Sequence, residues 1–248
     1  FLPRTNYSAQ ERCRTLLEQE LLNNDFYIFG WRQVPVNPKV LGQKANDTRP
    51  EIEQIIFACE KKYDFQELER KLFIIRKKIE NQAAKEQLND FYISSLSSKS
   101  VIYKGMFLAE NIADFYPDLM DERFTSRFAI FHQRFSTNTF PSWELAQPFR
   151  VLAHNGEINT LKGNVNWMKT HEAGMESDLF DNIDDIKPII KANNSDTASL
   201  DAAFELLVRG GRGLPIAKMM LIPEAWSKKS KIISKAHRDM YNLSLIHI

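Results

Sequence analysis

Three polar clusters in the sequence carry side chains that are suited to ligand binding and acid–base chemistry. The clusters are HQRFSTNT at 132–139, AHNGEIN at 153–159 and NNSDTASLD at 193–201. Each one follows an apolar run or precedes a helical pattern, so we expect each to lie where a strand ends or a helix begins. Such positions leave backbone groups and short polar side chains free to contact a ligand.

Arg134 is the candidate cation of the first cluster. Its guanidinium has the planar fork that holds a carboxylate through two parallel N–H bonds. An ordinary surface arginine, or one paired with Asp or Glu, explains the residue equally well when it is taken alone. His132 and His154 have no carboxylate or cysteine at ligand spacing, so we expect packing and hydrogen bonding from them rather than catalysis or metal binding.

The dipeptide Asn155-Gly156 is the strongest tight-turn signal in the chain. A second strand does not follow it, because the next apolar residues have helical spacing, at Ile158, Leu161, Val165 and Met168. The pair is therefore predicted to join a strand to a helix. There the Asn155 amide and the Gly156 N–H can stabilise an oxyanion. An ordinary turn is the alternative.

Asp196 lies just before a helical run in the third cluster. Its carboxylate can accept a hydrogen bond from an ammonium group. Asp and Ser near the start of a helix are routinely only caps, and for the residue taken alone we favour that interpretation.

The composition is that of a globular chain without a strong overall charge. Of the 248 residues 43% are apolar, and 33 basic against 32 acidic residues give a net charge of +1. This balance argues against nucleic acid or a membrane as partner, and the longest apolar runs are too short to span a bilayer.

Cys13 and Cys59 lack metal-type spacing and fall in core-like patterns. They indicate a reducing, cytoplasmic compartment and no nucleophilic cysteine.

Local patterns predict an α+β layered domain. A helix is expected at 8–24, where Ser8 and Glu11 form a capping-box pattern. Further helices are expected at 64–79, 158–174, 196–209 and around 215–226. Strands are expected at 26–36, 51–59, 90–97, 100–107, 127–135 and 149–156. We expect 90–97 and 100–107 to pair antiparallel, and the last two strands to be buried and central. No G-x-G-x-x-G or P-loop pattern is present, which removes the commonest nucleotide-binding interpretations.

The three clusters and their surroundings resemble the class II glutamine amidotransferases, and most of all the glutaminase domain of glutamate synthases. The core of the match is FHQRFSTNTFPSWELAQPFRVLAHNGEINTLKGN at 131–164. Weaker similarity extends upstream through IFGWRQVPV, LERKLFIIRKKIE, FYISSLSS and IYKGM, and downstream through NSDTASLDAAFELLVRGG. Nearly the whole chain is covered, and a motif this long is far more specific than a lone glycine signature.

The resemblance implies a four-layer α/β/β/α fold of the N-terminal-nucleophile hydrolase type. It also implies that a chain-terminal cysteine attacks the side-chain amide of L-glutamine and releases ammonia. By motif position, Arg134 is expected to bind the α-carboxylate and Asp196 the α-ammonium group of glutamine. Asn155 and Gly156 are expected to form the oxyanion hole.

The resemblance also implies partners and cofactors outside this chain. Ammonia would pass to a synthase domain of the same parent protein, which uses 2-oxoglutarate, flavin mononucleotide (FMN) and an iron–sulfur cluster. A small electron-donating subunit or ferredoxin would supply electrons. We expect no cofactor or metal within these residues.

One departure from the family pattern concerns the nucleophile. Phe1 stands where the family's cysteine is expected, and neither Cys13 nor Cys59 matches the motif. We therefore expect 1–242 to be an incomplete amidotransferase domain that lacks its first strands and cannot hydrolyse glutamine alone. The last residues, LSLIHI at 243–248, resemble a translated sequencing adapter.

Two other functions fit the same residues. One is the glutaminase of another class II amidotransferase, in which case the downstream domain decides the product. The other is a non-catalytic module that binds amino acids, an alternative supported only by the missing cysteine.

Overall fold

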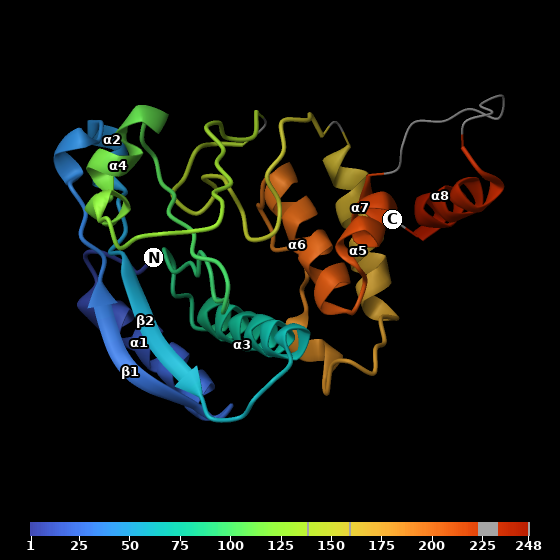
Figure 1. Ribbon diagram of the computed structural model, residues 1–248, viewed down its shortest axis with the longest axis horizontal. Coiled ribbons are helices and arrows are strands. Elements are labelled where there is room, and N and C mark those ends of the chain that lie inside the picture. Colours follow the sequence, from blue (N-terminus) through green and yellow to red (C-terminus); the bar gives the residue numbers. More distant parts are fainter. Residues whose placement is uncertain (138, 159, 223–232, 248) are drawn as a thin grey trace. The chain divides into compact units, whose positions relative to one another are not determined.

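A computed structural model of the chain describes residues 1–137, 139–158, 160–222 and 233–247, with 242–247 as backbone only. The chain divides into two compact units, Phe1–His154 and Asn155–Ile248. The first unit mixes helices with a two-stranded sheet, and the helices of the second are α5 to α8 (Figure 1). The expected mixture of helix and strand is therefore confirmed.

The first helix, α1 (Tyr7–Leu22), lies where the capping pattern and apolar spacing predict it. Its N-cap is Asn6, whose side chain accepts from the Ala9 N–H at 3.0 Å, and not Ser8 as the sequence pattern suggested. Asn and Ser are equally good N-caps, so residue type alone does not distinguish Asn6 from Ser8 as the cap. One face of the helix is buried, through Gln10, Cys13, Leu16, Leu17 and Leu21.

Strands β1 (Phe26–Gln33) and β2 (Glu53–Cys59) confirm the strands predicted at 26–36 and 51–59, and the two form an antiparallel pair. The register runs from Phe26 opposite Cys59 to Gln33 opposite Glu53 and is interrupted between Ile28 and Gly30. Gly30 has a φ of 145° at this irregularity, a backbone conformation that glycine adopts without steric cost.

Helix α3 (Phe65–Lys85) begins at Asp64, which caps the N–H groups of Gln66 and Glu67. The predicted helix is confirmed and is longer than its apolar repeat. Together α1, α3 and one face of the sheet enclose the main core, which contains Leu16, Leu17, Leu21, Phe26, Leu72, Ile75, Ile79, Ala83 and Ile93. Cys13 is fully buried and Cys59 packs partly against this core, so their expected structural role is confirmed.

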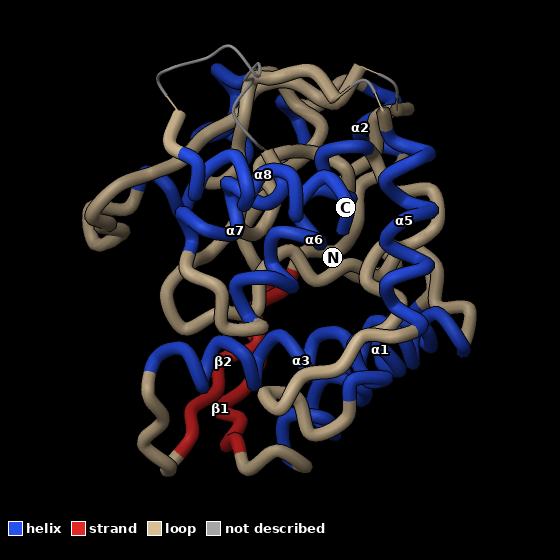
Figure 2. Tube along the Cα trace, turned by 90° about the vertical axis from the view of Figure 1, so that its right-hand side faces the viewer, coloured by secondary structure: helices blue, strands red, loops and turns tan. Residues whose placement is uncertain are grey.

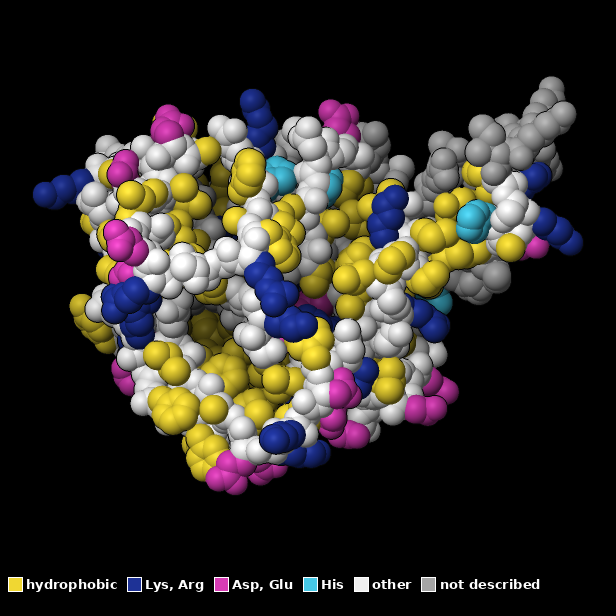
Figure 3. Space-filling model, in the orientation of Figure 1, with side chains coloured by type: hydrophobic (Ala, Val, Ile, Leu, Met, Phe, Trp, Pro, Cys, Tyr) yellow, Lys and Arg dark blue, Asp and Glu magenta, His cyan; other side chains and the backbone are white. Residues whose placement is uncertain are grey.

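The other face of the sheet leaves large apolar side chains exposed. Tyr27 is 53% exposed, Phe29 73% and Ile56 50%. Figure 3 shows hydrophobic side chains at the surface over this part of the first unit. A two-stranded sheet alone is only marginally stable, so the packing of its inner face against α1 and α3 is what supports it.

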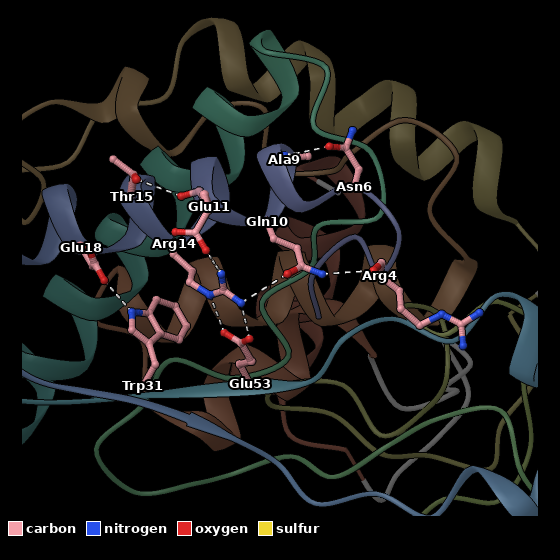
Figure 4. A network of polar contacts seen from close by, with 10 residues as sticks. All are labelled: Arg4, Asn6, Ala9, Gln10, Glu11, Arg14, Thr15, Glu18, Trp31 and Glu53. Atoms are coloured by element: carbon pink, nitrogen blue, oxygen red, sulfur yellow. Dashed lines mark hydrogen bonds and ion pairs between the residues drawn. The ribbon is translucent and has the colours of Figure 1, made fainter.

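A network of polar contacts joins α1 to the sheet (Figure 4). The guanidinium of Arg14 on α1 binds the carboxylate of Glu53 on β2, with 2.8 Å between Nε and Oε2. The indole N–H of Trp31 on β1 donates to Glu18 on α1 at 2.6 Å. The Arg14–Glu53 hydrogen bond raises the pKa of the guanidinium further above its ordinary value. The network fixes the rotation of α1 over the strands.

The segments at 90–97 and 100–107 are loops, so the predicted antiparallel strand pair is wrong. Backbone N–H groups that would bond to a neighbouring strand in a sheet donate here to side-chain oxygens. The Ile102 N–H donates to the Ser95 hydroxyl at 3.3 Å, and the Ser98 N–H donates to the Glu69 carboxylate at 2.8 Å. Serine side chains compete with sheet hydrogen bonds in this way, and the serine-rich composition of this stretch is the physical reason for the error.

The predicted buried strands at 127–135 and 149–156 are also absent, since both segments are loops in the described structure. Phe128 is 76% exposed, Ile130 62% and Phe131 88%, so the first of them is at the surface. An apolar run forms a strand only where another strand completes its hydrogen-bond ladder. Figure 2 shows how much of the chain is loop.

A second cluster in the first unit gathers aromatic residues around short helical turns. It includes Phe115, Tyr116 and Trp143, which pack with Val34 and Ile52. The turns are η1 (Pro38–Val40), α2 (Gln43–Asp47), η2 (Ala109–Asn111), α4 (Ile112–Phe115) and η3 (Pro117–Met120). Trp143 donates its indole N–H to the Ala45 carbonyl at 3.0 Å, which ties the loop after residue 140 to this cluster.

The second unit contains α5 (Leu161–Ala173), η4 (Ile183–Ile186), α6 (Asp196–Arg209), α7 (Leu214–Leu221) and α8 (Lys235–His247). Helices α5 and α6 confirm the predictions at 158–174 and 196–209. Helix α7 confirms the start of the one expected around 215–226, and residues 223–226 lie outside the described part. Helix α7 packs against α6 and α8.

Candidate functional site

Arg134 belongs to the first unit and is exposed, in a loop and not at a strand end as predicted. Its backbone N–H donates to Nδ1 of His132 at 3.2 Å. The side chain is therefore open to a ligand while the backbone is held. An exposed guanidinium of this kind can accept a carboxylate through two N–H bonds.

His132 connects two of the predicted clusters. Its Nε2 lies 2.6 Å from the carbonyl oxygen of His154, and the two imidazole rings have centroids 6.5 Å apart. This confirms that His132 serves hydrogen bonding, as its surroundings in the sequence suggested. Among the described residues there is no group of three His, Cys, Asp or Glu side chains that could hold a metal ion.

Asn155 and Gly156 open the second unit, and both are exposed. They precede α5, as the helical spacing after them predicts, but the segment before them is a loop and not a strand. The corner is thus a loop-to-helix junction. Exposed amide and backbone donors at such a junction can face a ligand.

Asp196 is the first residue of α6 and is 8% exposed. The N-cap is the preceding Ser195, which accepts from the Ala198 N–H at 3.0 Å, so the cap interpretation assigned to Asp196 was wrong by one residue. One carboxylate oxygen of Asp196 accepts from the N–H of Thr197 at 2.6 Å and from its hydroxyl at 3.2 Å. These two bonds hold the Asp196 carboxylate at the start of α6.

The four candidate residues are divided between the two units. Arg134 lies in the first unit, and Asn155, Gly156 and Asp196 lie in the second. Their convergence around one amino-acid ligand stays a prediction.

Each unit contains a cavity in its described part, and neither of these two cavities is lined by a candidate residue. The first, of about 430 Å³, lies between β2 and the loop at 91–103. The second, of about 560 Å³, is lined mainly by apolar side chains and includes Met168, Met175, Met220 and Met240. No helix in the described part of the chain is long and apolar enough to cross a membrane.

Sequence reasoning missed the role of His132 as a link between clusters. In HQR, His132 precedes Arg134 by two residues, a spacing that allows the His132 ring to accept a hydrogen bond from the Arg134 backbone N–H. This spacing was the sequence signal for the contact. The contact from His132 to the His154 carbonyl joins residues 22 positions apart, and no local sequence pattern predicts it.

Comparison with known proteins identifies the family. The model of the class II glutamine amidotransferases matches residues 1–248. The glutamate synthase [NADPH] large chain of Azospirillum brasilense is 60% identical over 226 residues, which cover 91% of this chain. The corresponding large chain of Bacillus subtilis is 45% identical over 234 residues, covering 94%. The chloroplastic ferredoxin-dependent glutamate synthase of Spinacia oleracea is 42% identical over 237 residues, covering 95%.

These relatives are much longer than the present sequence. The aligned part spans about 15% of the length of each of the three. The family match, in contrast, extends over all 248 residues and includes the three polar clusters. The chain belongs to the class II glutamine amidotransferases.

Proposed function

We propose that this chain is the glutaminase segment of a glutamate synthase large chain and contributes to hydrolysis of L-glutamine to glutamate and ammonia. The observation that carries the proposal is the family match over residues 1–248, joined with 60% identity to a glutamate synthase large chain. The alternative that another biosynthetic domain uses the ammonia has less support, because the glutamate synthases match over nine-tenths of the chain.

The fold we propose for the complete domain is the four-layer α/β/β/α arrangement of N-terminal-nucleophile hydrolases, of which this chain is an incomplete part. The exposed apolar face of β1 and β2 supports this, since large side chains such as Phe29 and Ile56 are suited to contact a further layer.

In the proposed reaction a cysteine thiolate attacks the side-chain carbonyl carbon of glutamine. The carbonyl oxygen becomes an oxyanion, which accepts hydrogen bonds from the side-chain amide of Asn155 and the backbone N–H of Gly156. The intermediate collapses as the amide nitrogen takes the proton that the thiol released on forming the thiolate, and the nitrogen leaves as ammonia. Water then cleaves the γ-glutamyl thioester to glutamate and free thiol.

The thiol in this scheme belongs to a cysteine other than Cys13 and Cys59. Burial raises the pKa of the Cys13 thiol to about 11, which disfavours the thiolate, and Cys59 lies at the end of β2 with its sulfur 3.5 Å from the Lys61 carbonyl oxygen. We propose that the chain alone does not hydrolyse glutamine.

Arg134 and Asp196 are proposed to select an α-amino acid. The guanidinium binds the α-carboxylate, and the carboxylate of Asp196 binds the α-ammonium group. The exposed guanidinium and the low exposure of Asp196 support these roles, since a largely desolvated carboxylate attracts an ammonium group more strongly than an exposed one does.

The cofactors of the synthase reaction are proposed to bind outside these residues. An iron–sulfur cluster requires several cysteine ligands, and the 248 residues contain only Cys13 and Cys59. FMN, 2-oxoglutarate and the electron donor, a small subunit or ferredoxin, are assigned to the remainder of the parent protein. The cysteine pattern supports a reducing, cytoplasmic compartment.

The test is glutamine hydrolysis by the complete large chain and its variants. We expect Arg134→Ala to lower kcat/KM for glutamine by roughly 10- to 150-fold, the cost of about 1.5–3 kcal/mol for a lost charge-assisted hydrogen bond. The matched control is Arg127→Ala, which removes an exposed arginine from the same loop.

For Asp196 the informative change is to Asn. The amide oxygen of Asp196→Asn still accepts from Thr197, so the start of α6 is retained while the charge that binds the ammonium group is lost. We expect a similar loss of kcat/KM, with Asp178→Asn as an exposed control. Near-normal kcat/KM in both Arg134→Ala and Asp196→Asn would reject the glutamine-binding assignment.

A further inference from the structure

The two ring nitrogens of His132 have different hydrogen-bonding roles. The Arg134 N–H can only donate, so Nδ1, 3.2 Å away, acts as the acceptor. The His154 carbonyl oxygen can only accept, so Nε2, 2.6 Å away, carries the proton and donates it. Both contacts are satisfied by one form of the ring, the neutral Nε2–H tautomer.

The two contacts act on the backbone of the two candidate segments. The carbonyl of His154 lies in the same planar peptide unit as the N–H of Asn155, so a bond that holds this carbonyl also sets the direction of the Asn155 N–H. The contact to Nδ1 holds the backbone from which the Arg134 guanidinium extends. One ring therefore contacts the peptide unit that leads into the Asn155-Gly156 corner and the backbone of Arg134.

We propose that His132 is a positioning residue for glutamine hydrolysis, and this inference rests on the function proposed above. Through its Nδ1 acceptor it orients Arg134 toward the α-carboxylate, and through its Nε2 donor it orients the oxyanion-stabilising corner. Since both ring nitrogens are engaged by backbone groups, the ring is not the general base of the reaction.

The two functions of the ring are separable by substitution. In His132→Asn the side-chain oxygen reaches the place of Nδ1 and retains an acceptor for the Arg134 N–H. In His132→Gln the side-chain amide reaches the place of Nε2 and retains a donor for the His154 carbonyl. His132→Ala removes both.

The experiment measures kcat and KM for glutamine in the complete large chain. Because small misplacements of binding groups reduce rates strongly, we expect His132→Ala to lower kcat/KM by roughly 10- to 100-fold. We expect His132→Asn to lower kcat while its KM stays near the wild-type value. We expect His132→Gln to raise KM while its kcat stays near the wild-type value. His171→Ala, an exposed histidine on α5, is the matched control and should behave like the wild type.

The outcomes that overturn the inference are distinct from those that overturn the function. Wild-type kinetics in His132→Ala, or equal losses in all three variants with unchanged thermal stability, would contradict the positioning role. The ring's tautomer is a readout that needs no turnover: nitrogen NMR of the chain should show His132 protonated at Nε2 alone. A proton on Nδ1 at neutral pH would overturn the inference whether or not glutamine is hydrolysed. A complete wild-type large chain without glutaminase activity would contradict the proposed function instead.

Discussion

The thiol of Cys13 lies in the core of the first unit, on the buried face of α1. Burial raises its pKa to about 11, so almost none is ionised near neutral pH. We expect iodoacetamide at pH 8 to modify Cys59, which is partly exposed, and to leave Cys13 unmodified until the chain is unfolded. Peptide mass spectrometry distinguishes the two sites. Labelling of native Cys13 at a rate similar to that of Cys59 would contradict the buried environment.

Single residues were predicted best where a local rule decides their role. Cys13 was placed in the core from its spacing to Leu16, Leu17 and Leu21, and Asp64 was recognised as the start of a helix. Asp196 shows the limit of such rules, because Ser195 and Asp196 are both good caps and only the structure assigns the cap to Ser195.

At the scale of elements, α1 depends on a partly buried ion pair for its attachment to the sheet. Arg14 contacts two glutamates, of which the Glu53 side chain is 9% exposed and the Glu11 side chain 71%. Removing Glu53 leaves the half-buried guanidinium without its main partner, and we expect Glu53→Ala to lower the free energy of unfolding by about 1.5–3 kcal/mol.

The matched control for this pair is Glu11→Ala. Its carboxylate contacts the same guanidinium from an exposed position on the same helix, so its loss should cost less than about 0.5 kcal/mol. Urea unfolding of the chain measures both variants. Equal costs for the two glutamates would show that burial does not determine the strength of the contact.

The helices of both units were predictable because the information for a helix is local. Capping residues and apolar positions three or four apart located α1, α3, α5 and α6. The segment 127–135 has the composition of a strand, but a strand exists only where another segment completes its ladder. Nothing within RFAIFHQRF reveals whether that partner is present, and so this prediction failed.

At the scale of the whole molecule, several carboxylates make stability dependent on acid. Arg12 lowers the pKa of Glu86 to about 2, Arg123 lowers that of Asp121 to about 2, and Arg32 lowers that of Asp118. These pKa values are below those of the unfolded chain, which are about 4. The unfolded chain therefore binds more protons between roughly pH 2 and pH 4, and stability should fall as the pH is lowered through this range.

The measurement is the midpoint of thermal unfolding between pH 5 and pH 2.5 at low ionic strength, where exposed charges are least screened. Arg12→Gln should flatten the curve, because Glu86 loses the partner that lowers its pKa. The exposed Arg127→Gln should leave the curve unchanged. A midpoint that does not fall toward acid pH would contradict the expected proton uptake.

The candidate site is a property of the whole molecule, since Arg134 and Asp196 are 62 positions apart in the sequence and belong to different units. The resemblance to class II amidotransferases predicted which residues form the site. Composition and periodicity contain no information on whether these side chains meet, because convergence depends on packing between distant segments.

The most direct test of this account is a crystal structure of the complete large chain with L-glutamate, the product of the proposed glutaminase, bound. We predict that the α-carboxylate of the ligand lies within hydrogen-bond distance of the Arg134 guanidinium and that its α-ammonium group contacts the Asp196 carboxylate. The γ-carboxylate should then lie beside Asn155 and Gly156. Glutamate bound elsewhere, with Arg134 and Asp196 on opposite sides of the molecule, would contradict the account.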